Sequence, residues 1–367
     1  MFVLDIYLNN FDINKNKFMD YKCFCNSLYS LRVITSILKL YMGPRMIKVT
    51  LLTFSGLEDY YWYYYDLDYE MNSRWLLGLF RDNIKGINFG ETCGKLGFSG
   101  FLVEIDGTEQ TIAHSYGLTN SFYVCDGRAF DLYQSRYLGF ALMESSKQNS
   151  NLKAAIFQDI INLQQDTSDC SEGGDPDEDL HNEKRYTLHD ANSDELYTVN
   201  IVSPKTGKLI AVQAGLFNTN FWTTPEKQKL HNCYSYACNY AGGSYSQPGG
   251  NTEKLRQERT MKVVIDGAIS DGLVMLDDYR NERDYPNHVV ALFTTDDYAD
   301  DWDYHWYRLV LNNKHERSHM WAHKPGRMSV RKTDNKNEII KDPRNAERGK
   351  YTQFGGYFRV NNQVKIK

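Results

Sequence analysis

Long hydrophobic runs are missing from this chain. No stretch of its 367 residues reaches the roughly 18 consecutive apolar residues of a membrane-spanning helix. The amphipathic run within residues 30–42 is interrupted by Arg32 and Lys39. The first residues carry no basic leader and turn polar at Asn9 and Asn10, so we expect no secretory signal. The sequence therefore predicts a protein without a membrane span, more typical of the cytoplasm or of a virion than of secretion.

The regular cysteine pairs of a disulfide framework are also missing. The chain has seven cysteines, an odd number at irregular spacing: Cys23, Cys25, Cys93, Cys125, Cys170, Cys233 and Cys238. Reduced thiols in a reducing compartment fit this pattern better. Cys23 and Cys25 have no second pair nearby that would complete a zinc site.

An excess of positive charge is absent, since the formal net charge is -5 at pH 7. Such a balance gives no general attraction to nucleic acid or to an anionic membrane, so we expect neither as a partner. The sequence has no P-loop and no G-x-G-x-x-G after a strand, so we expect no organic cofactor. Hydrophobic residues make up 41% of the chain, which is enough for a packed core.

The pattern of predicted elements divides the chain into four parts. Residues 1–45 are expected to be a peripheral N-terminal segment, and residues 46–165 a small mixed α/β domain of unknown role. Residues 166–186 are acidic and contain Gly and Pro, which is typical of a solvated linker. In residues 187–367 one helix precedes a series of strands, which predicts an α+β domain.

Several segments of the chain have a strand-like composition. Residues 98–105 alternate in polarity and end at Asp106-Gly107, so residues 111–114 are their expected hairpin partner. Residues 262–267, Lys-Val-Val-Ile-Asp-Gly, predict a further strand.

The clearest chemical signal lies in residues 231–238, His-Asn-Cys-Tyr-Ser-Tyr-Ala-Cys. Asn232 is a good helix cap, so Cys233 is predicted to begin a helix that ends at residues 242–243, Gly-Gly. A thiol there faces unpaired N–H groups and the positive end of the helix dipole, which favour the thiolate and lower its pKa. The same N–H groups can stabilise an oxyanion. Cys233 is therefore the predicted nucleophile, whereas Cys238 is predicted to face the core.

Two histidines downstream supply a candidate base and a residue to orient it. His305 lies in Asp-Tyr-His-Trp-Tyr-Arg (303–308), and His323 lies in Trp-Ala-His-Lys-Pro-Gly (321–326); both segments predict strands. If their hairpin is centred near Lys314, the two side chains share one face and can form a hydrogen bond. His305 would then accept the thiol proton, and His323 would fix its tautomer. A shift of one residue would place them on opposite faces.

Other interpretations of these residues stay open. His288 opens the predicted strand 289–293 and is an alternative base. Cys233 and the histidines could also be packed core residues without a catalytic role.

Metal binding is a further alternative. His315, His319 and His323 are spaced by four residues, which on a helix would form a metal-binding face. The stretch is predicted as loop and strand, so we expect no metal there. His114 together with Cys93 and Cys125 could build a second site, although isolated residues of this kind are more often structural.

The order of the candidate residues resembles a known superfamily. A Cys at a helix start, a His on a strand and a polar residue on the next strand are similar to papain-like cysteine hydrolases of the NlpC type, which include cell-wall peptidases, amidases and acyltransferases. More narrowly, the motifs N-C-Y-x-Y-A (232–237), D-Y-H-W-Y-R (303–308) and W-x-H-K-P-G (321–326) resemble poorly characterised bacterial and viral proteins. The resemblance covers roughly residues 225–360. It departs from the superfamily where Asn-Cys-Tyr-Ser replaces Asp-Cys-Ser-Gly and where His288, not His305, opens a strand as His-Val.

By position, the resemblance implies that Cys233 is the nucleophile, His305 the base and His323 the polar third residue. It implies a papain-like C-terminal domain in which the helix bearing Cys233 packs on an antiparallel sheet. The implied activity is that of a cysteine peptidase or amidase working through a thioester, with a peptide, an isopeptide or a cell-wall amide as substrate. The alternative is a non-catalytic structural or interaction protein, such as a virion or assembly component, that keeps the fold.

Overall fold

The structure is a computed structural model whose described residues build an α+β fold with two sheets. They are residues 46–65, 72–90, 96–107, 109–165, 196–217, 219–222, 224–242, 245–280, 288–312, 319–360, 364 and 366. Residues 46–367 form one compact unit. The predictions for residues 1–45 and for the linker 166–186 lie outside the described residues. So do Cys23, Cys25, Cys93 and Cys170.

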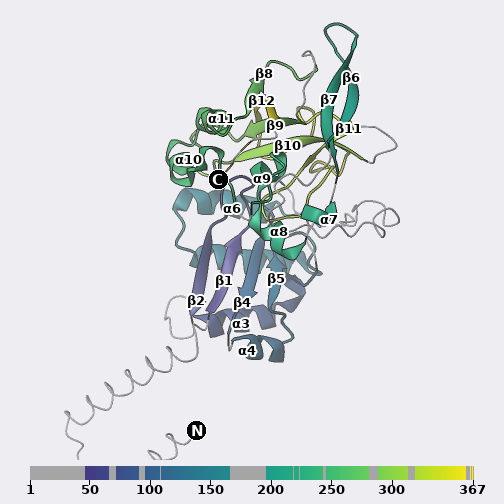
Figure 1. Cartoon of the computed structure of the whole chain (residues 1–367). Helices are drawn as coiled ribbons and strands as arrows, with labels where there is room; N and C mark the ends of the chain where they lie inside the picture. Colours follow the sequence, from purple (N-terminus) through teal and green to yellow (C-terminus); the bar gives the residue numbers. More distant parts are fainter. Residues whose placement is uncertain are drawn as a thin grey trace, which may run out of the picture. The chain divides into compact units, whose positions relative to one another are not determined.

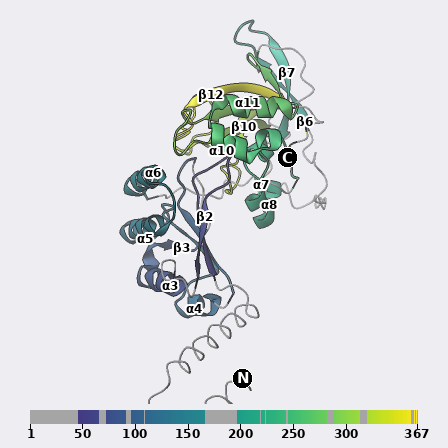
Figure 2. The same cartoon turned by 90° about the vertical axis from the view of Figure 1, so that its left-hand side faces the viewer.

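The first sheet is antiparallel throughout and has the strand order β2-β1-β4-β5-β3 (Figure 1). Its strands are β1 (Met46–Leu51), β2 (Tyr61–Tyr65), β3 (Ile87–Asn88), β4 (Phe101–Ile105) and β5 (Ser121–Val124). The helices of this part of the chain are α3 (Ser73–Asp82), α4 (Glu109–Ser115), α5 (Leu132–Ser145) and α6 (Ser150–Ile161). Alternation along β1 buries Ile47 and Val49 on one face. That face packs on α3, α5 and α6 through Leu76, Leu138 and Ile156 (Figure 2).

The predicted partner of the strand at residues 98–105 is wrong. Residues 111–114 belong to helix α4, and β4 pairs instead with β1 and β5. The chain turns at Gly107 with a φ of 62°, after which Gln110 donates a hydrogen bond to the Ile105 carbonyl at 3.0 Å. Ala113 is buried against the core. A helix turns the apolar side of this segment toward the core better than a strand would.

The second sheet carries the segments predicted to hold the histidines. Its strands are β6 (Leu196–Val202), β7 (Leu209–Leu216), β8 (Val274–Leu276), β9 (His288–Thr294), β10 (Tyr304–Leu311), β11 (His319–His323) and β12 (Gln353–Val360). Strands β11, β10, β9, β12 and β8 form an antiparallel run. Strand β7 joins β10 and β9 in parallel, and β6 pairs with β7 (Figure 1).

Strand β10 is buried on both faces. Tyr304 and Trp306 pack in one core cluster with Cys233 and Tyr234, whereas Tyr307 packs on the opposite side. The helices of this half are α7 (Thr219–Trp222), α8 (Pro225–Leu230), α9 (Cys233–Ala237), α10 (Thr252–Glu258) and α11 (Met261–Ser270). The antiparallel sheet and the helix bearing Cys233 are therefore in contact through β10.

The strand predicted over residues 262–267 is also wrong, because these residues lie in helix α11. Thr260 caps this helix by accepting a hydrogen bond from the Val263 N–H at 3.4 Å. Val263, Val264 and Ala268 bury one helical face, so the short apolar run satisfied the helical period as well as the strand period.

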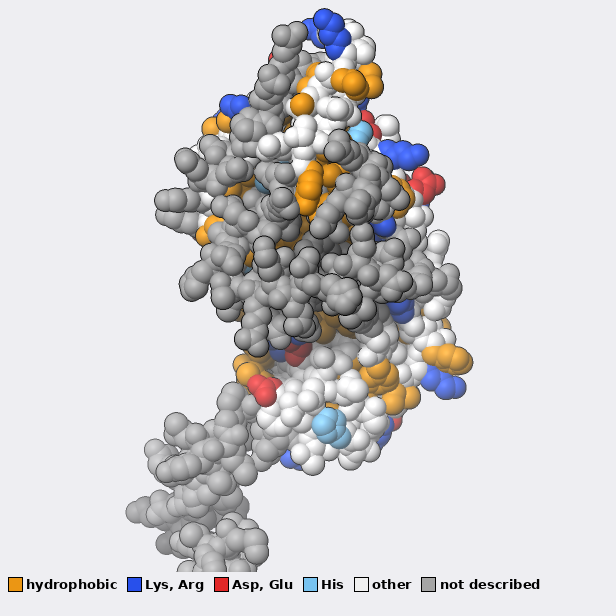
Figure 3. Space-filling model, turned by 45° about the vertical axis from the view of Figure 1, so that its right-hand side comes forward, with side chains coloured by type: hydrophobic (Ala, Val, Ile, Leu, Met, Phe, Trp, Pro, Cys, Tyr) orange, Lys and Arg blue, Asp and Glu red, His pale blue; other side chains and the backbone are white. Residues whose placement is uncertain are grey.

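Within the described ranges, every helix is too short or too polar to cross a bilayer. On the face drawn in Figure 3, Lys and Arg side chains are scattered among other residues and gather in no single patch of the described surface. This distribution agrees with the small net charge of -5.

We expect opposite effects from alanine at two helical glycines. In α11, a Cβ at Gly267 would lie 2.6 Å from the Pro248 carbonyl, which is backbone and cannot move aside cheaply. Gly267→Ala should lower the free energy of unfolding by about 1–3 kcal/mol. Gly78→Ala in α3 meets nothing within 4 Å and should raise it by up to about 1 kcal/mol. Urea unfolding measures both, and equal shifts of the same sign would contradict the packing described for α11.

Candidate functional site

Helix α9 begins at Cys233, as the sequence predicts. The Asn232 side chain accepts a hydrogen bond from the Ser235 N–H at 2.9 Å and caps the helix. The predicted extension to residues 242–243 is wrong, since the helix ends at Ala237. Asn239 adopts a left-handed φ of 53°, and this conformation stops the helix.

The Cys233 thiol is neutral and fully buried. Burial raises its pKa, the nearby Asp303 carboxylate adds to the rise, and a hydrogen bond with Ser55 opposes it. The prediction of a lowered pKa is therefore wrong for this conformation. Desolvation of the thiol raises the pKa by more than the N-terminus of the short helix lowers it. The sulfur lies 3.8 Å from the Tyr304 carbonyl oxygen, toward which its S–H points. Cys238 is buried in the same core cluster, as predicted.

The two predicted histidines meet across the β10–β11 hairpin. The register places Tyr307, not His305, opposite His323. Because the offset is two residues, His305 and His323 still share one face, and the His305 Nε2 atom lies 2.9 Å from the His323 Nδ1 atom. The turn near Lys314 lies outside the described residues.

Hydrogen-bond acceptors fix the proton positions on both rings. Burial lowers the pKa of His323 to about 3 and lowers that of His305 well below its usual value, so both rings are neutral. The His323 Nε2 atom lies 2.9 Å from the Thr333 carbonyl, which only accepts, so Nε2 carries the proton. The His323 Nδ1 atom then accepts from the His305 Nε2–H. The His305 Nδ1 atom is left with a free lone pair for a donor.

Ser55 supplies that donor, and sequence reasoning missed it. Its hydroxyl forms a hydrogen bond with the His305 Nδ1 atom, and the same side chain contacts Cys233. Ser55 lies in the β1–β2 loop (residues 52–60), in the half of the chain with no predicted role. Only the Ser-Gly dipeptide marked this stretch, and it indicated nothing beyond a turn.

The Asp303 carboxylate holds the β1–β2 loop in place. It accepts hydrogen bonds from the backbone N–H groups of Ser55, Gly56 and Leu57, and from the Tyr351 hydroxyl at 2.6 Å. Burial raises its pKa, which Lys350 and these donors oppose. Asp303 opens the D-Y-H-W-Y-R motif, so a signal for it was present in the sequence.

The carbonyl of Gly56 is held by two side-chain amides. It accepts from the Asn232 Nδ2 atom at 2.8 Å and the Gln247 Nε2 atom at 2.9 Å, and the Tyr304 hydroxyl oxygen lies 3.3 Å away. The preceding carbonyl, of Ser55, lies 3.4 Å from the backbone nitrogen of Cys233. The turn is thus bound through its backbone by residues adjoining the thiol.

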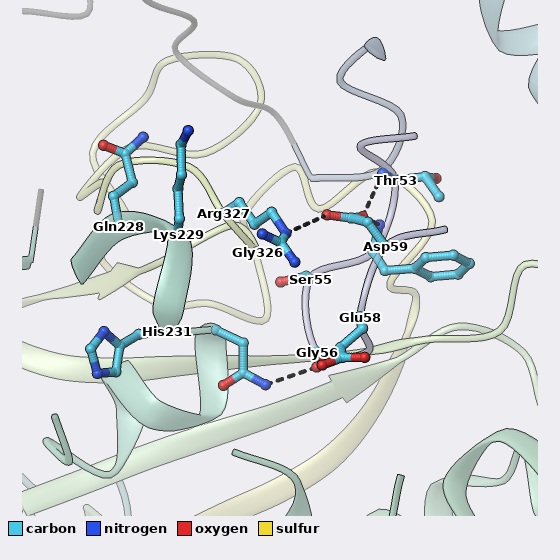
Figure 4. Close-up of polar contacts among 12 residues, drawn as sticks. Thr53, Ser55, Gly56, Glu58, Asp59, Gln228, Lys229, His231, Gly326 and Arg327 are labelled. Atoms are coloured by element: carbon cyan, nitrogen blue, oxygen red, sulfur yellow. Dashed lines mark hydrogen bonds and ion pairs between the residues drawn. The ribbon is translucent and has the colours of Figure 1, made fainter. Parts of the chain in front are cut away.

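A second ionic contact anchors the same loop. The Asp59 carboxylate accepts from the N–H groups of Thr53 and Phe54, and an oxygen lies 3.6 Å from the Arg327 Nε atom (Figure 4). Burial raises the pKa of Asp59 to about 7, against these contacts. A small pocket beside the loop is lined by Thr53, Ser55, Asp59 and Arg327 among others.

Lys324, in the W-x-H-K-P-G motif, is also fully buried near the thiol. Its Nζ atom donates to the carbonyls of Gln228, His231 and Gly326, each at 2.6 Å. Burial lowers its pKa to about 7, and the neighbouring Cys233 opposes this change. With its donors occupied by carbonyls, Lys324 fixes the segment before α9 against the segment after β11.

The alternative base, His288, lies at the other end of α9. Its Nε2 atom is 2.7 Å from the Ala237 carbonyl oxygen, and burial lowers its pKa to about 3. It thus contacts the end of the helix that is opposite Cys233.

The other candidate residues lie apart from this cluster. His114 is exposed on α4 and bonds to Asn120, whereas Cys125 is buried and bonds to the Ser135 carbonyl. His319 opens β11, and His315 lies outside the described residues. Among the described residues, no group of three or more His, Cys, Asp or Glu side chains is placed to hold a metal ion.

Together, the fold and the site define an α+β protein with a buried cysteine–serine–histidine cluster. No protein-family model matches the chain, and no solved structure matches it. Insoluble matrix shell protein 1 of Ruditapes philippinarum is 31% identical over 153 residues, which are 41% of this chain and 93% of that protein. The chain therefore belongs to the same family as Insoluble matrix shell protein 1.

The buried imidazoles predict a defined pH dependence of stability. Because the folded-state pKa of His323 is about 3 and that of a free histidine is about 6.5, the unfolded state binds more protons between these values. The contribution of the neutral His323 ring to stability is therefore full above pH 6.5 and is lost as the pH falls toward 3. His323→Gln should reduce the slope of unfolding free energy between pH 6 and 4 by about 1.4 kcal/mol per pH unit.

Urea unfolding at several pH values measures this slope. His114→Gln is the matched control, since it removes one histidine from an exposed position and no buried imidazole. An unchanged slope in His323→Gln would show that this imidazole is not held neutral in the fold.

Proposed function

We propose that the chain is a cysteine-dependent hydrolase or acyltransferase of the papain-like kind, acting on an amide or peptide bond through a thioester on Cys233. The observation that carries this proposal is the neutral His305–His323 pair, in which the His305 Nδ1 atom accepts from the Ser55 hydroxyl beside the Cys233 thiol. The order of parts also fits, with α9 against β10 and His323 on the neighbouring strand.

In this mechanism His305 takes the thiol proton. When the Ser55 hydroxyl leaves the His305 Nδ1 atom, that atom accepts the proton of the Cys233 S–H. His323 supports the transfer, because its Nδ1 atom accepts from the His305 Nε2–H and stabilises the imidazolium that forms. Thr333 holds the His323 tautomer through its carbonyl.

The reaction then follows the usual course of acyl transfer to sulfur. The Cys233 thiolate attacks the substrate carbonyl carbon, the C–N bond breaks, and the leaving amine takes the proton from His305. Water hydrolyses the thioester, or an amine accepts the acyl group. The groups that hold the Gly56 and Ser55 carbonyls, which are the side-chain amides of Asn232 and Gln247 and the Cys233 N–H, would stabilise the oxyanion.

A second candidate function is a structural role without turnover. The relative is named as a protein of insoluble shell matrix, and the thiol here is buried and neutral. On that alternative, the polar cluster would serve only to join the β1–β2 loop to the second sheet. The catalytic and the structural function differ in whether the Cys233 thiol reacts with an electrophile faster than a buried thiol without a base would.

Labelling with a peptidyl vinyl sulfone, followed by mass spectrometry, distinguishes the candidates. We expect an adduct on Cys233 that is absent in Cys233→Ala and unchanged in the control Cys238→Ala. His305→Gln should slow labelling by about 100-fold or more, since a general base contributes on this order. The loss of the Ser55–His305 bond would by itself loosen the loop and speed labelling, so a decrease reports the base. Equal rates in the unaltered chain and His305→Gln would exclude the catalytic role.

A further inference from the structure

We propose that the Ser55-Gly56 turn occupies the substrate-binding site in the way a substrate would. The Cys233 site then binds a polypeptide segment that has glycine at the position taken by Gly56. The proposal rests on the proposed function for its chemistry and names the substrate class of that same site. It rests on three observations: which backbone groups are held, what surrounds Gly56, and what the turn covers.

The turn is bound as a peptide backbone is bound. The N–H groups of Ser55, Gly56 and Leu57 donate to the Asp303 carboxylate. The Gly56 carbonyl accepts from the side-chain amides of Asn232 and Gln247, which supply two donors to one oxygen. Since these contacts involve main-chain atoms, another peptide in the same conformation could make them.

The lack of space around Gly56 makes the site selective for glycine. A Cβ at this position would lie 2.4 Å from the Tyr304 Cε2 atom. Tyr304 cannot turn aside cheaply, because it is fully buried and its hydroxyl donates to the Gln247 Oε1 atom at 2.9 Å. Gly56 does not have a positive φ, so the restriction comes from the Tyr304 ring and not from backbone strain.

The turn also covers the reactive groups. The Ser55 side chain contacts both Cys233 and His305, and the Ser55 carbonyl lies 3.4 Å from the Cys233 nitrogen. Cys233 and His305 have no exposed surface. A substrate can therefore reach the thiol only when the turn leaves, and the contacts it vacates are those that would bind the incoming peptide.

Access to the thiol tests the first part of this proposal. We expect Gly56→Ala to speed alkylation of Cys233 by iodoacetamide by about tenfold or more, because the added methyl group weakens the closed state. Gly78→Ala is the matched control and should leave the rate unchanged, since its Cβ meets nothing within 4 Å. Gln247→Glu is a second variant, which removes one donor to the Gly56 carbonyl without a steric clash. It should also speed alkylation by about tenfold.

Protection in trans tests the second part. The peptide Thr-Phe-Ser-Gly-Leu-Glu-Asp, which copies residues 53–59, should slow alkylation of Cys233 in folded Gly56→Ala, whereas the same peptide with Ala for Gly should not. Circular dichroism checks that each variant is folded. Unchanged alkylation in both Gly56→Ala and Gln247→Glu overturns the proposal, as does equal protection by the two peptides.

These outcomes are separate from the test of catalysis. Faster alkylation with glycine-specific protection, but vinyl sulfone labelling that does not depend on His305, would support the proposed binding site and contradict the hydrolase function. Vinyl sulfone labelling that depends on His305, with no effect of the turn variants on alkylation, would support the hydrolase function and contradict the proposed role of the turn.

Discussion

The arrangement of the site depends on one buried carboxylate. Asp303 accepts three consecutive backbone N–H groups and the Tyr351 hydroxyl, with no exposed surface of its own. A buried carboxylate is stable only when its oxygens are well bonded, so the loop and the carboxylate require each other. This mutual requirement connects the β1–β2 loop of the first sheet with the start of β10 in the second.

The two residues that follow Asp303 contact the same loop. The Tyr304 ring closes the space beside Gly56, with its hydroxyl 3.3 Å from the Gly56 carbonyl, and His305 bonds the Ser55 hydroxyl. Three consecutive residues on the β10 side therefore bind the backbone and one side chain of a single turn. The proposed thiol chemistry depends on this placement, because Ser55 contacts Cys233 and donates to the one lone pair that the histidine pair leaves for a donor.

Local patterns predicted part of this site. The Asn232 cap predicted the start of α9, and the alternation of aromatic residues predicted β10 and β11 as strands. His305 and His323 share a face because strand period is two and the register differs from the expected one by an even number. The strand predicted over residues 262–267 failed because a short apolar run fits either period, and the cap at Thr260 decides.

The rest could not be predicted, for physical reasons. The pKa of Cys233 rises because the thiol is desolvated, and a sequence does not report burial. Ser55 and Asp303 are 248 positions apart in the chain, so their bond is a product of folding that no local motif encodes. Gly56 carries no signal beyond a turn until Tyr304 is placed against it.

Amide hydrogen exchange at Ser55, Gly56 and Leu57 tests most directly whether the loop is part of the site. These three amides should exchange as slowly as those of β10, and at least about tenfold faster in Asp303→Asn, while the amides of β2 keep their rates. Exchange of the three amides in the unaltered chain as fast as in the exposed turn at residues 205–207 would contradict the account, since the loop would then not be held on Asp303.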